Sequence, residues 1–441
     1  MIMLTLLLLA CADPVLDCTV DLAPDMPTVP VVSWTQDAAA TGRVRYAGHV
    51  TADQGGARQR QLLPGLPPGT TVDIQAESEL DGQIRSCAAT VTTGQLPTEP
   101  PLLTVSTDET GDDAWFLATV YTLPGYASTQ VIFDRSGQVV WAHAADPDSF
   151  VVDVQPALDG DGILYDSFDA TRQQDLAALH RVGLDGAEGA PRALPQGHHM
   201  FAQLPDGTIA WQQFDVREGT DPSTGETESL VGDAIAELSP DGTVRTVFSA
   251  WDWVDVAHNR FMDLPSLYPQ GVDWTHGNAL KYLPEQDGYL LSLGNAGVVL
   301  QVDRTTDTPW QIVGNAGVPV ADDSNPLEHQ HDPTWLSDDR LLVFDSHFST
   351  YSSGAVEYAL QDGALHEVWR HGFQDGSFAL LLGQALRQDD GSTLVNYGSA
   401  GVLEQVDADD RVQWRVELPA QTGFAQVRVL GSWGEGAFPG W

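Results

Sequence analysis

Positive charge is scarce in this chain. It has 20 lysine and arginine residues against 62 aspartate and glutamate residues, which gives a net charge of −42, and Lys281 is its only lysine. A surface of this sign repels phosphate backbones, so the composition argues against nucleic-acid binding. The near absence of lysine removes most lysine chemistry, and no Gly-x-x-x-x-Gly-Lys-Ser/Thr phosphate loop is present. We interpret the acidity as an aid to solubility rather than as an acidic binding patch.

Long apolar runs are also scarce. The first ten residues are apolar and end at Cys11, a run too short to span a bilayer as a helix but typical of a secretory signal. Leu8-Leu9-Ala10-Cys11 resembles the bacterial lipobox, in which the cysteine is lipidated, although no lysine or arginine precedes the run. We therefore expect a lipoprotein-type signal peptide over residues 1–11. The protein would then be exported and lipid-anchored to the bacterial cell envelope, on the periplasmic or outer-membrane face.

Only two further cysteines are present, Cys18 and Cys87, and in an exported chain such a pair favours a disulfide. Alternating strand patterns and the turn at Leu66–Thr70 predict a small β-sandwich over residues 20–95. This stretch resembles a fibronectin type III domain, and the resemblance implies that the disulfide links its first and last strands. We expect the module to act as a spacer, followed by a Pro-rich linker over residues 96–104.

From residue 105 to residue 441 a repeat organises the chain. Its unit is an apolar strand, an Asp-rich turn and a second strand that often carries Trp or Val. Six copies occur, at residues 131–142, 179–191, 236–248, 300–313, 356–369 and 403–416. A second strand motif precedes most copies, which predicts four strands per repeat. The predicted fold is therefore all-β: a six-bladed β-propeller preceded by a small β-sandwich, with an array of β-sandwiches as the alternative.

Three histidine motifs precede the first hairpin of successive repeats. They are Gly197-His198-His199, Trp274-Thr275-His276-Gly277-Asn278 and His329-Gln330-His331-Asp332. Equivalent positions in successive repeats lie at symmetric places, and the first strand of a propeller blade runs beside the central axis. We therefore expect His199, His276 and His331 to converge at one mouth of the channel. A single histidine there would suggest a structural role, but three in register favour binding or catalysis.

Two kinds of chemistry suit such a cluster. Imidazole binds zinc, copper and iron, and both His-x-His and His-His pairs are present, but no Glu or Cys joins them at fixed spacing and no His-Glu-x-x-His motif occurs. Alternatively, neutral histidine acts as a nucleophile and protonated histidine stabilises an oxyanion. We expect no metal and no other cofactor.

The stretches "DWTHGNALKYLPEQDGYLLSLGN" and "HQHDPTWLSDDRLLVFDSH" resemble the bacterial aryl-sulfate sulfotransferase family, which does not use phosphoadenosine phosphosulfate. The resemblance covers roughly residues 105 to 430. It implies transfer of a sulfuryl group from an aryl sulfate to a phenol through a sulfohistidine. The family's nucleophile matches His331 of Gln330-His331-Asp332, and its Asp-Trp-x-His histidine matches His276. An earlier family histidine matches His199, where Met200 replaces the usual aspartate.

One departure concerns an arginine that the family places after the Asp-Trp-x-His strand. Gly294 or Asn295 stands there in this chain, although a guanidinium is the natural partner of sulfate oxygens. Arg260 and Lys281 are candidates to compensate. Further substrate-binding candidates are His198, His329, His347 and Asn278, and Asp332 is assigned an orienting role. The alternative functions are a non-catalytic lipoprotein that binds a ligand, metal or partner at the same pocket, and a purely structural surface lipoprotein.

Overall fold

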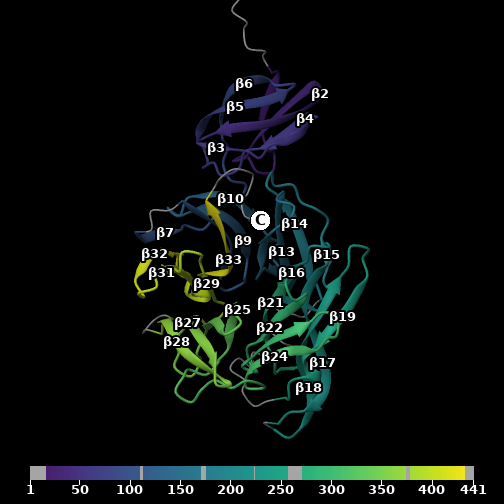
Figure 1. Cartoon of the computed structure of the whole chain (residues 1–441), viewed down its shortest axis with the longest axis vertical. Coiled ribbons are helices and arrows are strands. Elements are labelled where there is room, and N and C mark those ends of the chain that lie inside the picture. The colour runs from purple at the N-terminus through teal and green to yellow at the C-terminus, as the bar shows by residue number, and fades with distance from the viewer. Residues whose placement is uncertain are drawn as a thin grey trace, which may run out of the picture.

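The computed structural model describes residues 16–109, 113–169, 175–222, 224–256, 271–373 and 378–432. Within these ranges the chain is all-β, as predicted, and its helical content is two short 3₁₀ segments, η1 (Ala250–Asp252) and η2 (Gly398–Ala400) (Figure 1). No helix in the described ranges has the length and apolar character needed to cross a membrane. Cys11 and Arg260, both named as candidates, lie outside the described residues.

The N-terminal sheet has six strands, in the order β1-β2-β5-β6 with β3 and β4 also paired to β2. Their bounds are β1 (Cys18–Leu22), β2 (Pro30–Tyr46), β3 (His49–Val50), β4 (Gln54–Leu62), β5 (Thr71–Leu80) and β6 (Gln83–Thr92). β2 changes register between Thr35 and Ala40, so its first half pairs with β1 and its second half with β5. This bend wraps the strand around a core that includes Trp34 and Val44.

A disulfide joins Cys18 on β1 to Cys87 on β6, the pair that the sequence indicates, with the two Cα atoms 6.3 Å apart. Because β1 and β6 are the two outer strands of the pairing order, the bond closes the sheet on itself. The fibronectin type III resemblance and the division at residues 96–104 stay predictions.

Six further sheets follow within the described ranges, and each contains one copy of the repeat. The first three sheets are β33 (Thr422–Ser432), β8 (Ala114–Thr122), β9 (Ser128–Asp134) and β10 (Val139–Ala144); β11 (Ser149–Phe150), β12 (Val154–Pro156), β13 (Gly162–Asp169), β14 (Ala178–Gly183) and β15 (Arg192–Ala193); and β16 (Gly197–Gln203), β17 (Ile209–Thr220), β18 (Thr227–Leu238), β19 (Val244–Ser249) and β20 (Val272–Asp273).

The last three sheets are β21 (Gly277–Leu283), β22 (Gly288–Leu293), β23 (Val298–Asp303) and β24 (Pro309–Gly314); β25 (Gln330–Ser337), β26 (Arg340–Asp345), β27 (Gly354–Gln361) and β28 (Ala364–Gly372); and β29 (Gln384–Arg387), β30 (Thr393–Asn396), β31 (Val402–Val406), β32 (Val412–Glu417) and β7 (Thr104–Asp108).

The two ends of this region interlock. The late strand β33 pairs with β8 in the first sheet, and the early strand β7 pairs with β32 in the last. Figure 1 shows the sheets arranged around a shared centre, and the first strands of neighbouring sheets, such as β16 and β21, lie in contact. The arrangement is therefore propeller-like, with β12, β16, β21, β25, β29 and β33 as its inner strands.

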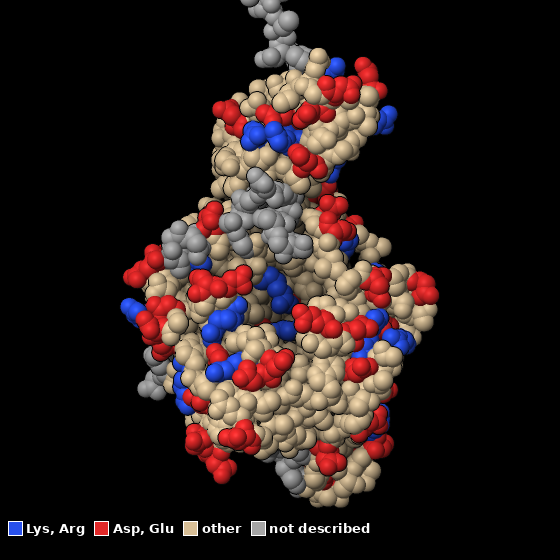
Figure 2. Space-filling model, in the orientation of Figure 1, with Lys and Arg blue, Asp and Glu red and all other residues tan. Residues whose placement is uncertain are grey.

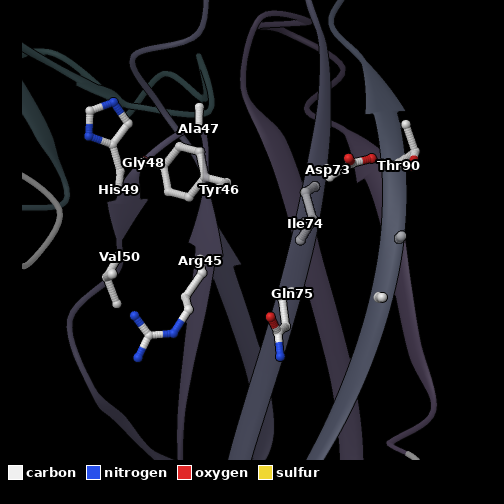
Figure 3. A pocket seen from close by; sticks show the side chains of 12 residues that line it. Arg45, Tyr46, Ala47, Gly48, His49, Val50, Asp73, Ile74, Gln75 and Thr90 are labelled. Atoms are coloured by element: carbon white, nitrogen blue, oxygen red, sulfur yellow. Dashed lines mark hydrogen bonds between the residues drawn. The ribbon is translucent and has the colours of Figure 1, made fainter.

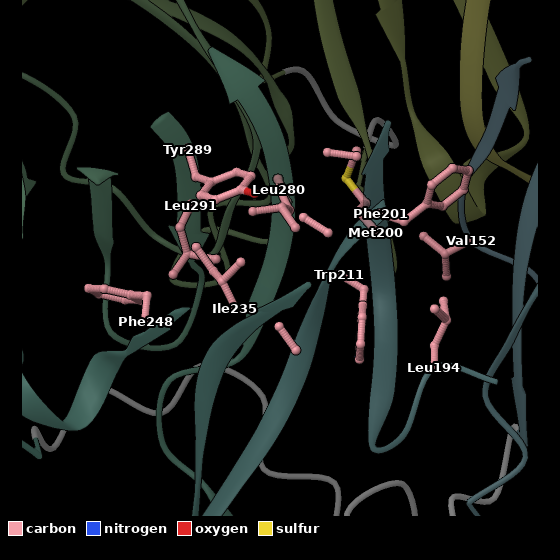
Figure 4. Close-up of a cluster of buried hydrophobic side chains, with 14 of the residues drawn as sticks. Val152, Leu194, Met200, Phe201, Trp211, Ile235, Phe248, Leu280, Tyr289 and Leu291 are labelled. Carbon is pink, nitrogen blue, oxygen red and sulfur yellow. The ribbon is translucent and has the colours of Figure 1, made fainter. Parts of the chain in front are cut away.

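Large apolar side chains fill the space between neighbouring sheets. Figure 4 shows one such cluster, in which Trp211 and Tyr289 pack with aliphatic residues. In the repeat copies, Trp141 and Trp414 are fully buried, and Trp414 stacks on Phe116 with ring centroids 4.9 Å apart. Burying a side chain of this size contributes about 2–3 kcal/mol. The aromatic residues of the repeat thus hold one sheet against the next.

The N-terminal sheet packs against the propeller-like region. Met26 belongs to a cluster with Trp141 and Leu184, and Arg60 forms an ion pair of 2.8 Å with Asp185. Residue 186 is a glycine with φ of +82°, and a Cβ atom there would lie 2.7 Å from the backbone of Asp25. A turn of the second sheet is therefore shaped to fit the N-terminal sheet.

Candidate functional site

Five imidazole rings form a continuous chain at the start of three neighbouring inner strands. The successive ring centroids lie 5.1 Å apart for His198 and His199, 5.1 Å for His199 and His276, 4.6 Å for His276 and His329, and 5.1 Å for His329 and His331. Each of the five residues is at least nine-tenths buried. We call this group the histidine cluster; it contains the three predicted catalytic histidines and two of the predicted substrate-binding ones.

The first two histidines lie on β16. The Nε2 atom of His198 lies 2.9 Å from Oδ1 of the buried Asp233, and its ring stacks on Phe214. Its Nδ1 atom lies 2.9 Å from Nδ1 of His199, whose φ is 56°. Burial alone would raise the pKa of Asp233, but hydrogen bonds from His198, Thr275 and a backbone N–H lower it. Asp233 is therefore a buried carboxylate that stabilises positive charge at this end of the cluster.

His276 lies in a tight turn between β20 and β21. The carboxylate of Asp273 accepts two hydrogen bonds, one from the backbone N–H of His276 at 3.0 Å and one from its Nδ1 at 2.6 Å. Gly277 follows because a Cβ atom there would lie 2.6 Å from the carboxylate of Asp233. The Asp-Trp-x-His-Gly motif thus fixes the imidazole with a carboxylate on one ring nitrogen, an arrangement that supports acid–base chemistry at the other.

The last two histidines flank Gln330, the first residue of β25. The Gln330 amide donates to Ser292 Oγ at 3.1 Å and to the carbonyl of Val298 at 3.0 Å, and so ties the strand to the preceding sheet. His331 is 2% exposed, and its Nε2 atom has no hydrogen-bond partner among the described residues. A buried imidazole nitrogen without a partner is costly unless it serves a ligand.

Burial controls the protonation of these two histidines. Burial, with a smaller contribution from the charge of His276, lowers the pKa of His331 to about 3. Burial also lowers the pKa of His329 well below its ordinary range, helped by His276 and His331. The Nδ1 atom of His329 donates to Oδ1 of Asn295 at 3.2 Å. His331 is therefore neutral at ordinary pH and keeps a lone pair for nucleophilic attack.

The pairing register differs from the sequence expectation. Each inner hairpin begins with one residue pair, namely Gly197–Gln213, Gly277–Leu293 and Gln330–Asp345. His276 and His329 each lie one residue before such a pair, and both have a positive φ, 51° and 63°. These two histidines are therefore the equivalent ones, and their rings make the closest contact in the cluster.

By the same count, His198 and His331 are equivalent, and His199 is equivalent to Asp332. His199 and Asp332 both lie in strand bulges, with φ of 56° and 46°. The expectation that His199, His276 and His331 hold equivalent positions is thus wrong. They converge because bulges and left-handed residues turn neighbouring side chains to opposite sides.

Position 294 is, with Asn295, one of the two places where the resemblance puts an arginine, and the space beside it is crowded. A Cβ atom at residue 294 would lie 2.6 Å from Nδ2 of Asn278 and 3.2 Å from Nδ1 of His329. Asn278 donates that Nδ2 to the carbonyl of Gln330 at 2.8 Å. His329 and Asn278 therefore occupy the space in which a side chain at position 294 would begin.

His347 has different neighbours. Its Nδ1 lies 3.4 Å from Asp345, and its ring contacts Phe373. The hydrogen bond from His347 to Asp345 raises the pKa of this histidine, against the opposing effect of burial. With Asp345 and Glu328 as its acidic neighbours, His347 is better described as an ion-paired structural residue than as a member of the histidine cluster.

Two ion pairs that the sequence did not assign lie farther along the inner strands. Lys281 Nζ lies 2.8 Å from Oδ1 of Asp332, and Arg428 Nη2 lies 2.6 Å from Oδ1 of Asp153. We call these four residues the charged network. Lys281 and Arg428 line a cavity of about 570 Å³. Figure 2 shows lysine and arginine side chains around a hollow where Figure 1 has β16 and β33.

A second cavity, of about 770 Å³, lies on the N-terminal sheet, where side chains of β2, β3, β5 and β6 such as Arg45, His49 and Asp73 line it (Figure 3). Thr90 donates its hydroxyl to Asp73 there at 2.7 Å, but this contact is exposed to solvent. Among the described residues, no three His, Cys, Asp or Glu side chains are grouped as a metal site. The histidine cluster is therefore the strongest candidate for chemistry.

These features define a class: an all-β protein whose sheets surround buried imidazoles suited to nucleophilic and acid–base chemistry. The model of the arylsulfotransferase (ASST) family matches residues 105–425. The chain belongs to that family, which confirms the resemblance seen in the sequence and identifies the protein, at family level, as a sulfotransferase.

Solved structures that match the chain are distant. A protein of unknown function from Bacteroides caccae is 14% identical, with 72% of this chain and 98% of that chain covered and a TM-score of 0.45. A virginiamycin B lyase from Staphylococcus aureus is 11% identical, with 89% and 100% covered and a TM-score of 0.35. Likenesses of this size carry no functional argument. None of the curated proteins matches the chain.

Proposed function

We propose that this protein transfers a sulfuryl group from an aryl sulfate to a phenol, with His331 as the nucleophile. The observation that carries the proposal is the buried, neutral imidazole of His331, whose Nε2 has no partner among the described residues and whose ring contacts the cluster. Such a nitrogen holds a lone pair that water does not compete for.

The reaction proceeds in two balanced steps. The Nε2 lone pair forms a bond to sulfur as the bond between sulfur and the aryl oxygen breaks, and the leaving phenolate takes a proton from protonated His276. The oxygen of an acceptor phenol then attacks the same sulfur, the N–S bond breaks and His276 recovers a proton from the acceptor. Asp273, 2.6 Å from Nδ1 of His276, stabilises the imidazolium that this cycle requires.

The remaining cluster residues suit the sulfuryl oxygens and the aryl ring. His199 is the proposed donor to the oxygens, joined by His276 until that residue gives its proton to the leaving oxygen, and preorganised hydrogen bonds matter most at these oxygens. The ring of Phe168 lies near His199 with centroids 6.4 Å apart, and that of Phe348 near His329 with centroids 5.1 Å apart. Aromatic side chains at these distances can stack on an aryl group.

Architecture and location belong to the same proposal. We propose that the six sheets are the six blades of a closed propeller, because β33 completes the first blade and β7 joins the last. The N-terminal sheet would be a fibronectin type III-like spacer between the propeller and a lipid on Cys11. The mass of the mature N-terminus of the expressed protein tests the lipid, and an unmodified Cys11 would contradict it.

A second function has one observation in its favour. A Cβ atom at residue 294 would crowd the side-chain amide of Asn278, and the chain has glycine and asparagine at positions 294 and 295, where the resemblance places the arginine that suits a sulfate. A non-catalytic protein that binds an aryl anion at the histidine cluster is the corresponding alternative.

The deciding experiment measures release of 4-nitrophenol from 4-nitrophenyl sulfate, with phenol as acceptor. Wild-type protein is expected to release 4-nitrophenol and form phenyl sulfate, whereas His331→Asn forms neither. His366→Asn, on the outer strand β28, is the matched control and should behave as wild type. Binding of the donor without turnover by wild-type protein would favour the alternative, and full activity of His331→Asn would exclude His331 as the nucleophile.

A further inference from the structure

The only lysine of the chain connects two inner strands of the propeller-like region. Lys281 lies on β21, and its side chain crosses to β25 of the next sheet. There Nζ donates hydrogen bonds to Thr334 Oγ1 at 2.7 Å and to the carbonyls of Pro333 at 3.0 Å and Asp332 at 3.3 Å. β21 and β25 belong to different sheets, so this side chain holds together two strands that share no ladder.

The partner of Lys281 is the residue next to the proposed nucleophile. Asp332 is fully buried, follows His331 directly and has φ of 46° within the bulge of β25. Besides the ion pair with Lys281, Gln384 Nε2 donates to its Oδ2 at 3.2 Å. A carboxylate buried beside a sulfate-binding site would repel the substrate unless a cation compensates it.

The neighbouring carboxylate is compensated in the same way. Asp153 pairs with Arg428. Burial alone would lower the pKa of Arg428, but the charges of Asp153 and Asp332 raise it. Asp332 therefore lies within electrostatic reach of the second ion pair. Asp332 and Asp153 each have a cation partner, although burial still raises the pKa of Asp153.

We propose that Lys281 is a positioning residue that neutralises Asp332 and fixes the bulge after His331, so that a monoanionic sulfuryl donor can bind beside the nucleophile. This inference rests on the proposed function. It assigns to the sole lysine an electrostatic role that acts through Asp332 and without contact to the substrate.

The donor and the acceptor distinguish this role from a mechanical one. An aryl sulfate is an anion, whereas phenol is neutral at ordinary pH. An uncompensated Asp332 carboxylate should weaken binding of the donor alone, while a loosened strand should impair both half-reactions.

The test compares Lys281→Met, Asp332→Asn, the double variant and Lys281→Arg with wild type. In Lys281→Met the KM for 4-nitrophenyl sulfate should rise about tenfold at about pH 8, and the KM for phenol should stay unchanged. The double variant should recover the wild-type donor KM, because neither charge remains, and Lys281→Arg should retain it. Equal impairment of both half-reactions without recovery in the double variant would overturn the proposal.

A second measurement does not depend on turnover. Titration of the His331 ring by NMR in histidine-labelled protein should give a higher pKa in Lys281→Met, because an unpaired carboxylate favours the imidazolium. The double variant should return to the wild-type value. An absence of transfer in wild-type protein would refute the proposed function but leave this titration decisive. Identical His331 titration in wild type and Lys281→Met would overturn the role of Lys281.

Discussion

The histidine cluster and the charged network meet on β25, where His331 and Asp332 are adjacent. The buried histidine loses its charge, whereas the buried aspartate keeps its charge and is paired with a cation. In the cluster, burial lowers the pKa of His331 to about 3 and so removes its charge. In the network, Asp332 and Asp153 are buried as well, and each is paired with a cation. Neighbouring positions thus provide a neutral nucleophile and a compensated carboxylate.

The backbone separates the two environments. Asp332 has a positive φ and lies in a bulge, so its side chain leaves the alternation that a regular strand would impose. His199, the equivalent residue on β16, has the same conformation but remains in the cluster. The same bulge conformation therefore occurs in both regions. The histidine at this position belongs to the cluster, and the aspartate belongs to the charged network.

The largest expected effect is a loss of folding stability at low pH, which we attribute to the histidine cluster and not to the charged network. The pKa of a histidine is about 6.5 in the unfolded chain and about 3 for His331 in the folded protein. Between these values the unfolded chain binds one more proton, so the free energy of unfolding falls as the pH drops from about 6.5 toward 3. The loss approaches about 5 kcal/mol for this one group. Denaturant unfolding at a series of pH values measures it.

His331→Asn should make that pH dependence shallower, because one titrating group is gone and the buried His329, whose pKa is also lowered, remains. Lys281→Arg should leave the dependence unchanged. An equally steep fall in His331→Asn would show that the burial of His331 does not control the acid sensitivity.

A second prediction concerns the carboxylate behind His276. Asp273→Asn keeps the shape of the turn but removes the negative charge that stabilises protonated His276. We expect kcat for sulfuryl transfer to fall about a hundredfold with little change in the KM for the donor. Steady-state kinetics of both half-reactions measure this. Unchanged kcat would remove His276 from the role of acid and base.

The repeat and the histidine motifs could be predicted from the sequence, because both are local patterns of a few residues. The Asp-rich turns mark one repeat copy in each of the six sheets, and the motifs at His276 and His331 mark the start of inner strands. The register was not accessible, since it depends on the bulges that offset His199 from His331. The partner of Lys281 was not accessible either, because β21 and β25 share no ladder.

A smaller effect tests why the arginine is missing. Gly294→Ala places a Cβ atom 2.6 Å from Nδ2 of Asn278, which should cost about 2 kcal/mol of stability through local crowding. Gly294→Ala/Asn278→Ala should recover part of this loss. Thermal unfolding measures both variants. A fully stable Gly294→Ala protein would show that the space can accept a side chain, and Gly294→Arg would then be the natural gain-of-function variant.

The central claim is that His331 carries the sulfuryl group between donor and acceptor. The most direct measurement is the intact mass of the protein after incubation with 4-nitrophenyl sulfate in the absence of phenol, followed by peptide mapping under mild alkaline conditions. We predict a gain of one sulfuryl group on His331, its loss on addition of phenol, and no gain in His331→Asn. A sulfuryl group on another residue, or turnover without any labelled protein, would contradict the account.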